Sequence, residues 1–370
     1  MTAVPVNTPV LGGNEHKYIA DCLQTGWVSS EGPYNREFEN RFSHYVNRSY
    51  GIAVSSGSAA LDVALQAIGI VRGDEVIMPA FTIISPAFSV VRAGALPVLV
   101  DADPLTWNMD VTQLAEKVTS RTRAIIVVHI YGLPVDMDPI LDIAKKHNLK
   151  IIEDAAEMHG QTYKGKMCGT FGDVSVFSFY SNKLITTGEG GMLVTDNEEI
   201  ANRCRKLRNL SFEPTGRRFV HYDMGWNYRM TNLQAALGVA QLEKVDEHLA
   251  KKKQIGNYYR TGLKSLKHFQ QPLDATADAE NVYWVYGLVA ESCELADATV
   301  SHLNQQGIST RPFFWSMHEQ PVFRKMGLFQ LDKHPVAEQL SRNGFYIPSG
   351  LGLSEGDQDY VINSLLSVNG

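Results

Sequence analysis

The sequence predicts an α/β protein: a large domain built on a mostly parallel β-sheet flanked by helices, and a smaller C-terminal α+β domain. Short apolar runs rich in β-branched residues alternate with helical stretches through the first two thirds of the chain. Hydrophobic residues make up 44% and charged residues 20% of the 370 residues, as in ordinary globular proteins. A chain of this length usually exceeds a single hydrophobic core, so we expect two domains.

Six short apolar segments are the predicted strands of the large sheet. They cover residues 51–54, 75–78, 98–100, 124–129, 150–154 and 173–179. Between the first two, Leu61, Ala64, Leu65 and Ile68 are spaced as the apolar face of a helix. The alternation of strands and helices is typical of parallel sheets, whose crossover connections are helical.

Thr231 is expected to cap one long helix that joins the two domains. Apolar residues from Leu233 to Leu249 follow it at helical spacing, and a basic run at 251–253 comes next. Beyond this helix, residues 281–290 alternate like a strand and 295–306 are predicted to be helical. We therefore assign residues 1–245 to the large domain and residues 246–370 to the small domain.

Composition argues against several classes of protein. The net charge of −6 disfavours a general nucleic-acid surface. No apolar run reaches membrane-spanning length and the first residues lack the features of a signal peptide, so we expect a cytoplasmic protein without membrane contact. The four cysteines, Cys22, Cys168, Cys204 and Cys293, are spaced too irregularly for a disulfide framework or a zinc site, and we expect reduced thiols and no metal.

Lys183 is the first candidate for chemistry. It follows the apolar segment 173–179 and precedes a glycine-rich turn at 188–191. An unpartnered ammonium group is costly to desolvate there, and burial lowers the pKa of a lysine until its neutral amine can attack a carbonyl to form a Schiff base. A lysine at a strand end can also simply extend its charged tip into solvent. The rest of the chain decides between these interpretations.

Two further segments offer partners for this lysine. The turn of Gly57, Ser58 and Ala59 follows strand 51–54 and starts a helix, where free backbone N–H groups can bind a phosphate. Asp154 ends strand 150–154, and the carboxyl ends of parallel strands face the ligand crevice. Each signal alone is weak, because such turns and strand ends are common. Together, an amine, a carboxylate and a phosphate site are the parts needed to hold pyridoxal 5′-phosphate.

Several segments also resemble the DegT/DnrJ/EryC1/StrS family of sugar-nucleotide aminotransferases, which are fold-type I pyridoxal phosphate enzymes. The resemblance spans nearly the whole chain and its segments occur in the family's order. They are residues 26–30, 73–77, 129–132, 152–157, 177–183, 187–192 and 227–232.

The resemblance implies a role for each matched residue. Lys183 would form the Schiff base with the cofactor and then act as the general base that moves the proton. Asp154 would pair with the ring nitrogen, and Glu157 would lie near the ring oxygen, although an acid at a helix start is often simply solvated. The residues that would hold the phosphate are Gly57, Ser58 and Ala59 in the turn and Ser178 through its hydroxyl group.

Asn227 matches a residue that the family sends in from the neighbouring subunit. The resemblance therefore implies a homodimer whose active sites are shared between subunits. Candidates for binding the substrate are Trp27, Arg229, Arg311, Trp315 and His318, with Arg217 and Arg218 as further candidates for its diphosphate. An arginine on its own is more often a surface residue, and a tryptophan is more often part of a core or interface.

Two positions depart from the family's pattern. Ile83 stands where members often carry an aromatic residue that stacks on the cofactor ring, so Ile83 and Phe81 remain alternatives for that contact. His159 stands where a small residue is common. We interpret His159 as a histidine packed in the structure, with a substrate contact as the alternative.

The activity implied by the resemblance is transfer of an amino group from glutamate to a nucleotide-linked 4-keto-6-deoxy sugar. Residues 311–314, His318 and the segments 27–30 and 227–232 point to C4 of GDP-4-keto-6-deoxy-D-mannose, which gives GDP-perosamine. The alternative is a dTDP- or UDP-linked 3- or 4-keto sugar. The related sugar 3-dehydratases have histidine in place of Lys183, so this lysine disfavours dehydration. A non-catalytic regulator that binds the cofactor would need a DNA-binding module, and the sequence gives no sign of one.

Overall fold

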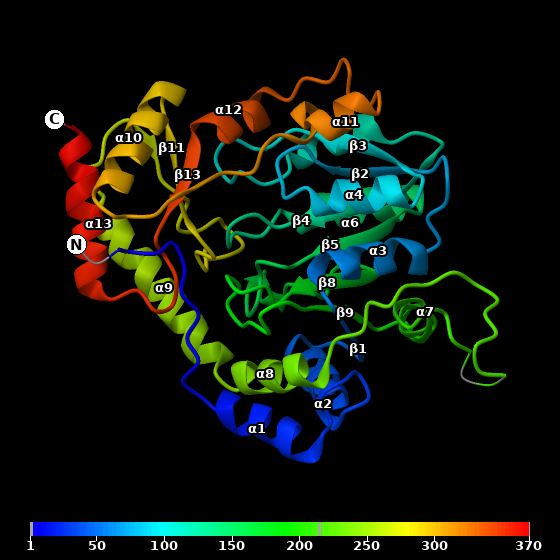
Figure 1. The fold of residues 1–370 in the computed structure, drawn as a ribbon. Coiled ribbons are helices and arrows are strands. Elements are labelled where there is room, and N and C mark those ends of the chain that lie inside the picture. Colours follow the sequence, from blue (N-terminus) through cyan, green and yellow to red (C-terminus); the bar gives the residue numbers. More distant parts are fainter. Residues whose placement is uncertain (1–2, 214, 216, 370) are drawn as a thin grey trace.

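A computed structural model describes residues 3–213, 215 and 217–369 of the chain. Its main feature is a seven-stranded sheet in the order β1-β9-β8-β5-β4-β2-β3 (Figure 1). The strands are β1 (Tyr50–Val54), β2 (Glu75–Pro79), β3 (Leu96–Val100), β4 (Thr122–Val128), β5 (Lys150–Asp154), β8 (Val174–Ser178) and β9 (Gly191–Thr195). Strands β2, β3, β4, β5 and β8 pair in parallel, whereas β9 runs antiparallel to both of its neighbours. The predicted α/β class with a mostly parallel sheet is confirmed.

Helices cover both faces of this sheet, and most residues of its strands are therefore buried. One face packs against α3 (Gly57–Ala67), α4 (Ser85–Arg92) and α7 (Glu198–Arg208). The other face packs against α2 (Pro33–Tyr45), α6 (Met137–His147) and α8 (Asn232–Leu242). Shorter or peripheral elements are α1 (Glu15–Thr25), α5 (Leu114–Lys117), the strand pair β6 (Thr162–Tyr163) and β7 (Lys166–Met167), and the 3₁₀ turn Val111–Gln113.

A second sheet of four antiparallel strands lies beside the first, in the order β10-β11-β13-β12 (Figure 1). These strands are β10 (Phe269–Gln270), β11 (Tyr286–Ala290), β12 (Arg311–Pro312) and β13 (Gly344–Ile347). The helices of this part are α9 (Val245–Gly262), α10 (Cys293–Gln305), α11 (Pro321–Lys325), α12 (Pro335–Asn343) and α13 (Glu355–Leu366), with 3₁₀ turns at Met317–Glu319 and Ser367–Asn369. The N-terminal segment joins this part through a bridge between Val4 and Ile308. The division at residue 245 stays a prediction.

The single long helix expected after Thr231 is instead two helices, α8 and α9. Thr231 caps α8 as predicted, with a reciprocal capping box to Gln234. The chain then turns at Glu243 and Lys244 before α9 begins. At this turn the Glu243 carboxylate accepts hydrogen bonds from Asn14, Tyr18 and Arg41, which ties the end of α8 to α1 and α2.

All four cysteines are free, as predicted. No helix in the described ranges combines the length and apolar character needed to span a membrane.

Candidate active site

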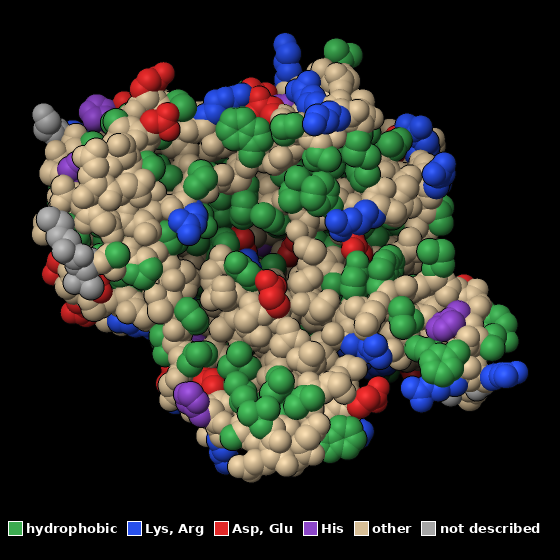
Figure 2. Space-filling view, in the orientation of Figure 1, with side chains coloured by type: hydrophobic (Ala, Val, Ile, Leu, Met, Phe, Trp, Pro, Cys, Tyr) green, Lys and Arg blue, Asp and Glu red, His purple; other side chains and the backbone are tan. Residues whose placement is uncertain are grey.

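A cavity of about 350 Å³ opens at the carboxyl ends of the parallel strands of the large sheet. Figure 2 shows the molecule hollowed near the middle of this face. Strands β4, β5 and β8 end at its wall with Val128, Asp154 and Ser178. Other lining residues from the large sheet's side are Ser56, Gly57, Ser58, Leu61, Thr82, Ile83, Ser85, Ala156, Glu157, Tyr180, Asn182, Lys183 and Glu189, and the second part contributes Trp284, Phe314 and Tyr346.

Lys183 lies in the loop between β8 and β9, with its side chain only 10% exposed. Its Nζ atom is 3.6 Å from Oε1 of Glu157 and 3.8 Å from the centroid of the Trp284 ring. Burial lowers the pKa of Lys183, while the charges of Glu157 and Asp154 oppose that shift. A buried amine in a cavity with a lowered pKa is suited to attack a carbonyl and to carry a proton.

The carboxyl group of Glu157 is held in place by a backbone hydrogen bond. Its Oε2 atom accepts a hydrogen bond of 2.7 Å from the backbone N–H of Tyr131, a residue in the left-handed conformation with φ of 57°. Burial raises the pKa of Glu157 to about 7, against the opposing influence of Lys183. The carboxyl group can therefore exchange a proton with its surroundings near neutral pH.

Asp154 is a buried carboxylate with few partners. It is 3% exposed, and its Oδ1 atom accepts a hydrogen bond from the Ala156 backbone N–H. Among the described residues no cation forms an ion pair with it, and burial raises its pKa to about 6. A group that stays positively charged inside the cavity would stabilise the ionised form of Asp154.

Glu153, the residue before Asp154, is a buried carboxylate with many hydrogen-bond partners. Glu153 is completely buried and accepts hydrogen bonds from the backbone N–H groups of Gly169, Phe171 and Gly172 and from the Ser175 hydroxyl, with His129 as a further partner. Since His129 Nδ1 accepts from the Val135 N–H, its Nε2 carries the proton given to Glu153. This network fixes the end of β5 from the side away from the cavity.

The predicted phosphate side of the cavity is rich in hydroxyl groups. Ser58 Oγ lies 2.7 Å from Ser85 Oγ, and Ser178 Oγ faces the same space. A Cβ atom at Gly57 would lie 3.0 Å from Cβ of Ser178, so the glycine lets the start of α3 approach the end of β8 closely. The Ala59 N–H, which we expected to face the phosphate, instead donates to Ser56 Oγ at the helix cap, and Ala59 does not line the cavity.

The remaining predicted site residues do not line the cavity within one chain. Trp27 is half exposed just after α1, where its backbone oxygen accepts a hydrogen bond from Asn232. Asn227 is exposed, and its Oδ1 accepts hydrogen bonds from Arg229. Arg311 is exposed beside Tyr346, its partner in the β12–β13 register, and Trp315 packs under Arg342. His318 also lies outside the cavity lining: it is 1% exposed, its Nε2 pairs with Glu338 at 3.0 Å, and its ring packs against His334.

Phe81 and Ile83, the two alternatives for the contact with the cofactor ring, differ in burial. Phe81 is fully buried and packs against Tyr131, Phe313 and Phe314, outside the cavity lining. Ile83 lines the cavity and is 43% exposed. The aromatic residues that do line it, Tyr180, Trp284, Phe314 and Tyr346, were missed, because in the sequence they are indistinguishable from core aromatics.

His159 packs inside the protein, as we interpreted it. Its ring contacts Phe42, Phe177 and Phe179, and burial lowers its pKa to about 3. The unfolded chain takes up a proton at this histidine below about pH 6.5, whereas the folded chain does not, so stability present above pH 6.5 is lost as pH falls toward 3.

We therefore predict that His159→Phe removes part of the acid sensitivity of the fold. Between pH 7 and pH 4.5 the wild type should lose about 3 kcal/mol more unfolding free energy than the variant. Urea unfolding at both pH values measures this difference, with the exposed His147→Gln as the control. Equal losses in His159→Phe and the wild type would contradict the assignment.

The residues of the cavity fit pyridoxal phosphate. Thr82 lines the cavity, and among the described residues its buried hydroxyl has no hydrogen-bond partner, which leaves one polar group at the wall unsatisfied. The under-paired Asp154 suits a protonated ring nitrogen, and the hydroxyls of Ser58 and Ser178 suit a phosphate. When bound, the cofactor supplies an aldehyde that condenses with amines and a ring that withdraws electrons.

Comparison with known proteins agrees with this site. A model of the DegT/DnrJ/EryC1/StrS aminotransferase family matches residues 9–366. The chain is similar to GDP-perosamine synthases of Caulobacter vibrioides, at 43% identity, and Escherichia coli O157:H7, at 40% identity, each covering 99% of this chain and 98% of the relative. The PLP form of Spr1654 from Streptococcus pneumoniae is a structural neighbour with a TM-score of 0.93 at 26% identity, covering 99% of this chain and 98% of that one. Lys183, Asp154 and Glu157 meet in one cavity and the family model matches almost the whole length, so the chain belongs to the DegT/DnrJ/EryC1/StrS family of pyridoxal phosphate-dependent aminotransferases.

Proposed function

We propose that the protein transfers the amino group of glutamate to C4 of GDP-4-keto-6-deoxy-D-mannose, giving GDP-perosamine and 2-oxoglutarate. The reaction type rests on one observation above all, the buried amine of Lys183 beside Glu157 and Asp154 in a single cavity. The choice of sugar is supported by the relatives named GDP-perosamine synthase, which match the chain from end to end.

The residues of the cavity divide the work. Lys183 is the nucleophile that holds the cofactor at rest and the base that moves a proton during transfer. Glu157 lies within 4 Å of the amine and stabilises its charged form. Asp154 keeps the ring nitrogen protonated, and Ser58 with Ser178 binds the phosphate. The aromatic residues Trp284, Phe314 and Tyr346 close the cavity from the second part and limit its water.

The test is a substrate screen with purified protein and glutamate. GDP-, dTDP- and UDP-linked 4-keto-6-deoxy sugars are supplied in turn, and the release of 2-oxoglutarate is followed. The proposal expects the GDP-linked sugar to react fastest and NMR of the product to place the new nitrogen on C4. Faster amination of a dTDP- or UDP-linked sugar, or nitrogen on C3, would replace the proposed substrate. Loss of the 3-hydroxyl without amination would instead indicate a dehydratase.

We also propose that the active form is a homodimer in which Asn227 of one chain completes the cavity of the other. Two observations support this. Asn227 is exposed and does not line the cavity of its own chain. The segment before it projects from the body of the protein after α7 (Figure 1) and carries apolar side chains in solvent, with Phe219 72%, Tyr222 78% and Met224 92% exposed. A second copy of the chain would bury such a surface.

Mixed dimers test the shared site. Lys183→Ala and Asn227→Ala chains are each expected to be poorly active alone, but a dimer containing one of each keeps one intact site. Random mixing should therefore restore about a quarter of the wild-type activity, since half of the dimers are mixed and each has one working site of two. Mixing Lys183→Ala with Asp154→Asn is the control, because both residues serve the cavity of their own chain and no site is rebuilt. Tagged mixed dimers that remain inactive would rule out the role of Asn227 across the interface.

A further inference from the structure

Trp284 makes the closest aromatic contact to the amine of Lys183. The Nζ atom lies 3.8 Å from the centroid of its ring, well inside the range of a cation–π interaction. Glu157 Oε1 lies 3.6 Å from the same atom. The ammonium group is therefore contacted by both an aromatic ring and a carboxylate. Trp284 is 6% exposed, so this contact is largely shielded from water.

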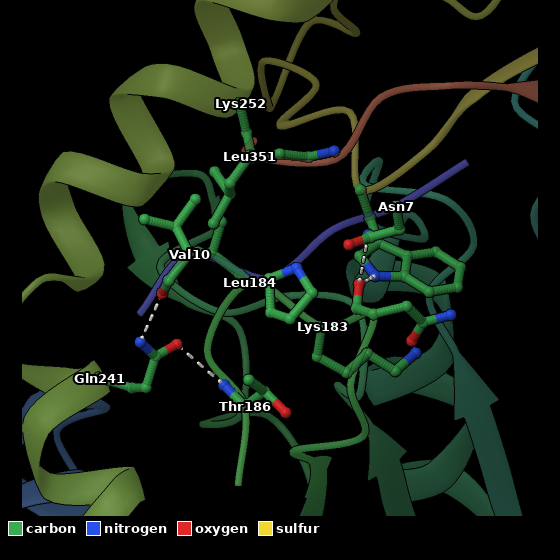
Figure 3. Close-up of a pocket in the computed structure, with 11 residues that line it drawn as sticks. Asn7, Val10, Lys183, Leu184, Thr186, Gln241, Lys252 and Leu351 are labelled. Atoms are coloured by element: carbon green, nitrogen blue, oxygen red, sulfur yellow. Dashed lines mark hydrogen bonds between the residues drawn. The ribbon is translucent and has the colours of Figure 1, made fainter. Parts of the chain in front are cut away.

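The ring of Trp284 is fixed by contacts to both parts of the protein. It comes just before β11 of the second sheet, and its Nε1 donates a 3.1 Å hydrogen bond to the backbone oxygen of Asn182, the residue preceding Lys183. Asn7 donates to the same oxygen, and Figure 3 shows Asn7 next to Lys183 at this point. The ring also stacks on Tyr131 with centroids 6.0 Å apart. Trp284 is thus tied to the peptide that carries the lysine.

We propose that Trp284 is a positioning residue: its ring face holds the ε-ammonium group of Lys183 over the main cavity and stabilises the protonated form of this side chain. The inference rests on the proposed function, in which Lys183 leaves the cofactor when the amino donor binds, accepts and returns a proton in each half-reaction, and rejoins the cofactor at the end of the cycle. A protonated amine that is held in place can return its proton to the reacting group. An aliphatic side chain at this position would leave the charge facing hydrocarbon.

The ionisable groups that act electrostatically on Lys183 change their charge with pH, whereas Trp284 does not. They are Asp154 at the end of β5 and, in the segment after it, Glu157 and His159, while Lys252 lines a small second cavity together with Lys183 (Figure 3). Burial raises the pKa of Asp154 to about 6 and that of Glu157 to about 7, so both carboxylates lose charge in mildly acidic solution. The attraction of the indole face does not change with pH.

The experiment measures the pKa of Lys183 while the shape of the ring stays nearly constant. Full-length protein is prepared with tryptophan, fluorotryptophan or difluorotryptophan, because fluorine withdraws the electron density that attracts the cation. The protein is loaded with pyridoxamine 5′-phosphate, which leaves the amine of Lys183 free. Brief acetylation at a series of pH values, followed by mass spectrometry of the Lys183 peptide, gives the pKa from the pH dependence of the labelling rate.

We expect the pKa of Lys183 to fall stepwise with fluorination, by about one unit in total. Lys252 provides an internal control in the same digest, because it is buried and, within the described part of the chain, has no cation–π contact. Trp284→Phe should lower the pKa of Lys183 less than Trp284→Leu, since phenylalanine keeps a weaker ring face. Asn7→Ala, which removes the other hydrogen bond to the Asn182 oxygen, should leave that pKa in place.

An unchanged pKa of Lys183 on fluorination, or an equal fall for Lys252, would overturn the proposal. The measurement uses neither glutamate nor a nucleotide sugar. A negative result therefore leaves the amination assay as the test of the proposed function, and failure of that assay leaves the labelling result interpretable.

Discussion

Replacing Lys183 with alanine is expected to lower the rate of amino transfer by a factor of about 10³ or more. The variant loses both the nucleophile and the side chain that moves the proton, and the described residues that line the cavity include no second lysine. Release of 2-oxoglutarate from glutamate, with the preferred nucleotide sugar as acceptor, measures the loss. Binding of the cofactor should persist, because the contacts of Asp154, Ser58 and Ser178 remain.

Lys183→Arg separates the charge of this residue from its chemistry. Arginine keeps a cation near Glu157 but stays protonated at any pH used for the assay, so it cannot act as a nucleophile. We expect Lys183→Arg to be as inactive as Lys183→Ala. Borohydride treatment of the wild-type protein should fix the cofactor onto the peptide that contains Lys183. Turnover of either variant within tenfold of the wild type, or a label on another peptide, would show that a different residue performs the reaction.

Asp154→Asn is expected to lower the rate by a factor of about 10² to 10³, with little change in protein volume. The amide has no negative charge to hold the proton on the cofactor's ring nitrogen, so the ring withdraws electrons less strongly. Steady-state kinetics with glutamate and the nucleotide sugar should show the loss mainly in kcat. Asp154 carries few hydrogen bonds, so the substitution breaks little of the surrounding structure.

An altered cofactor tests whether the loss of activity in Asp154→Asn acts through the ring nitrogen. N-methylpyridoxal phosphate carries a fixed positive charge at the ring nitrogen, and should restore part of the activity of Asp154→Asn. Glu157→Gln is the matched control, because it also exchanges a buried carboxylate of the cavity for its amide. The N-methylated cofactor should not improve Glu157→Gln relative to the ordinary one. Equal rescue of both variants would mean that Asp154 does not act through the ring nitrogen.

The sequence was most informative where the signal was local. Buried parallel strands appear as continuous apolar runs, which is why all six predicted strands exist and why Asp154 lies at the cavity. Strand β9 is not among the predicted strands although Gly191–Thr195 is apolar, because the glycines before it indicate only a turn. Thr231 was correctly predicted as a cap, since a capping box depends on residues three positions apart.

Contacts between distant segments could not be predicted in this way. Trp284 meets Lys183 only because the second sheet packs beside the first, and its sequence context is that of an ordinary core tryptophan. His318 was expected at the substrate, but its partner Glu338 lies in α12, so the contact depends on how that helix folds back. The turn between α8 and α9 likewise depends on side chains of α1 and α2 that bind Glu243.

The neighbouring carboxylates at the end of β5 also limit which insertions and deletions the strand can tolerate. Glu153 and Asp154 point to opposite faces of the sheet, one into a saturated network and the other into the cavity. Deleting or inserting one codon within the strand would exchange their faces. An insertion before the pair would bring Glu153, which reaches one methylene further, to the cavity position, whereas a deletion would bring the shorter Asp154 to the position in the network. Length variation among relatives should therefore fall in the loops around β5 and spare the strand itself.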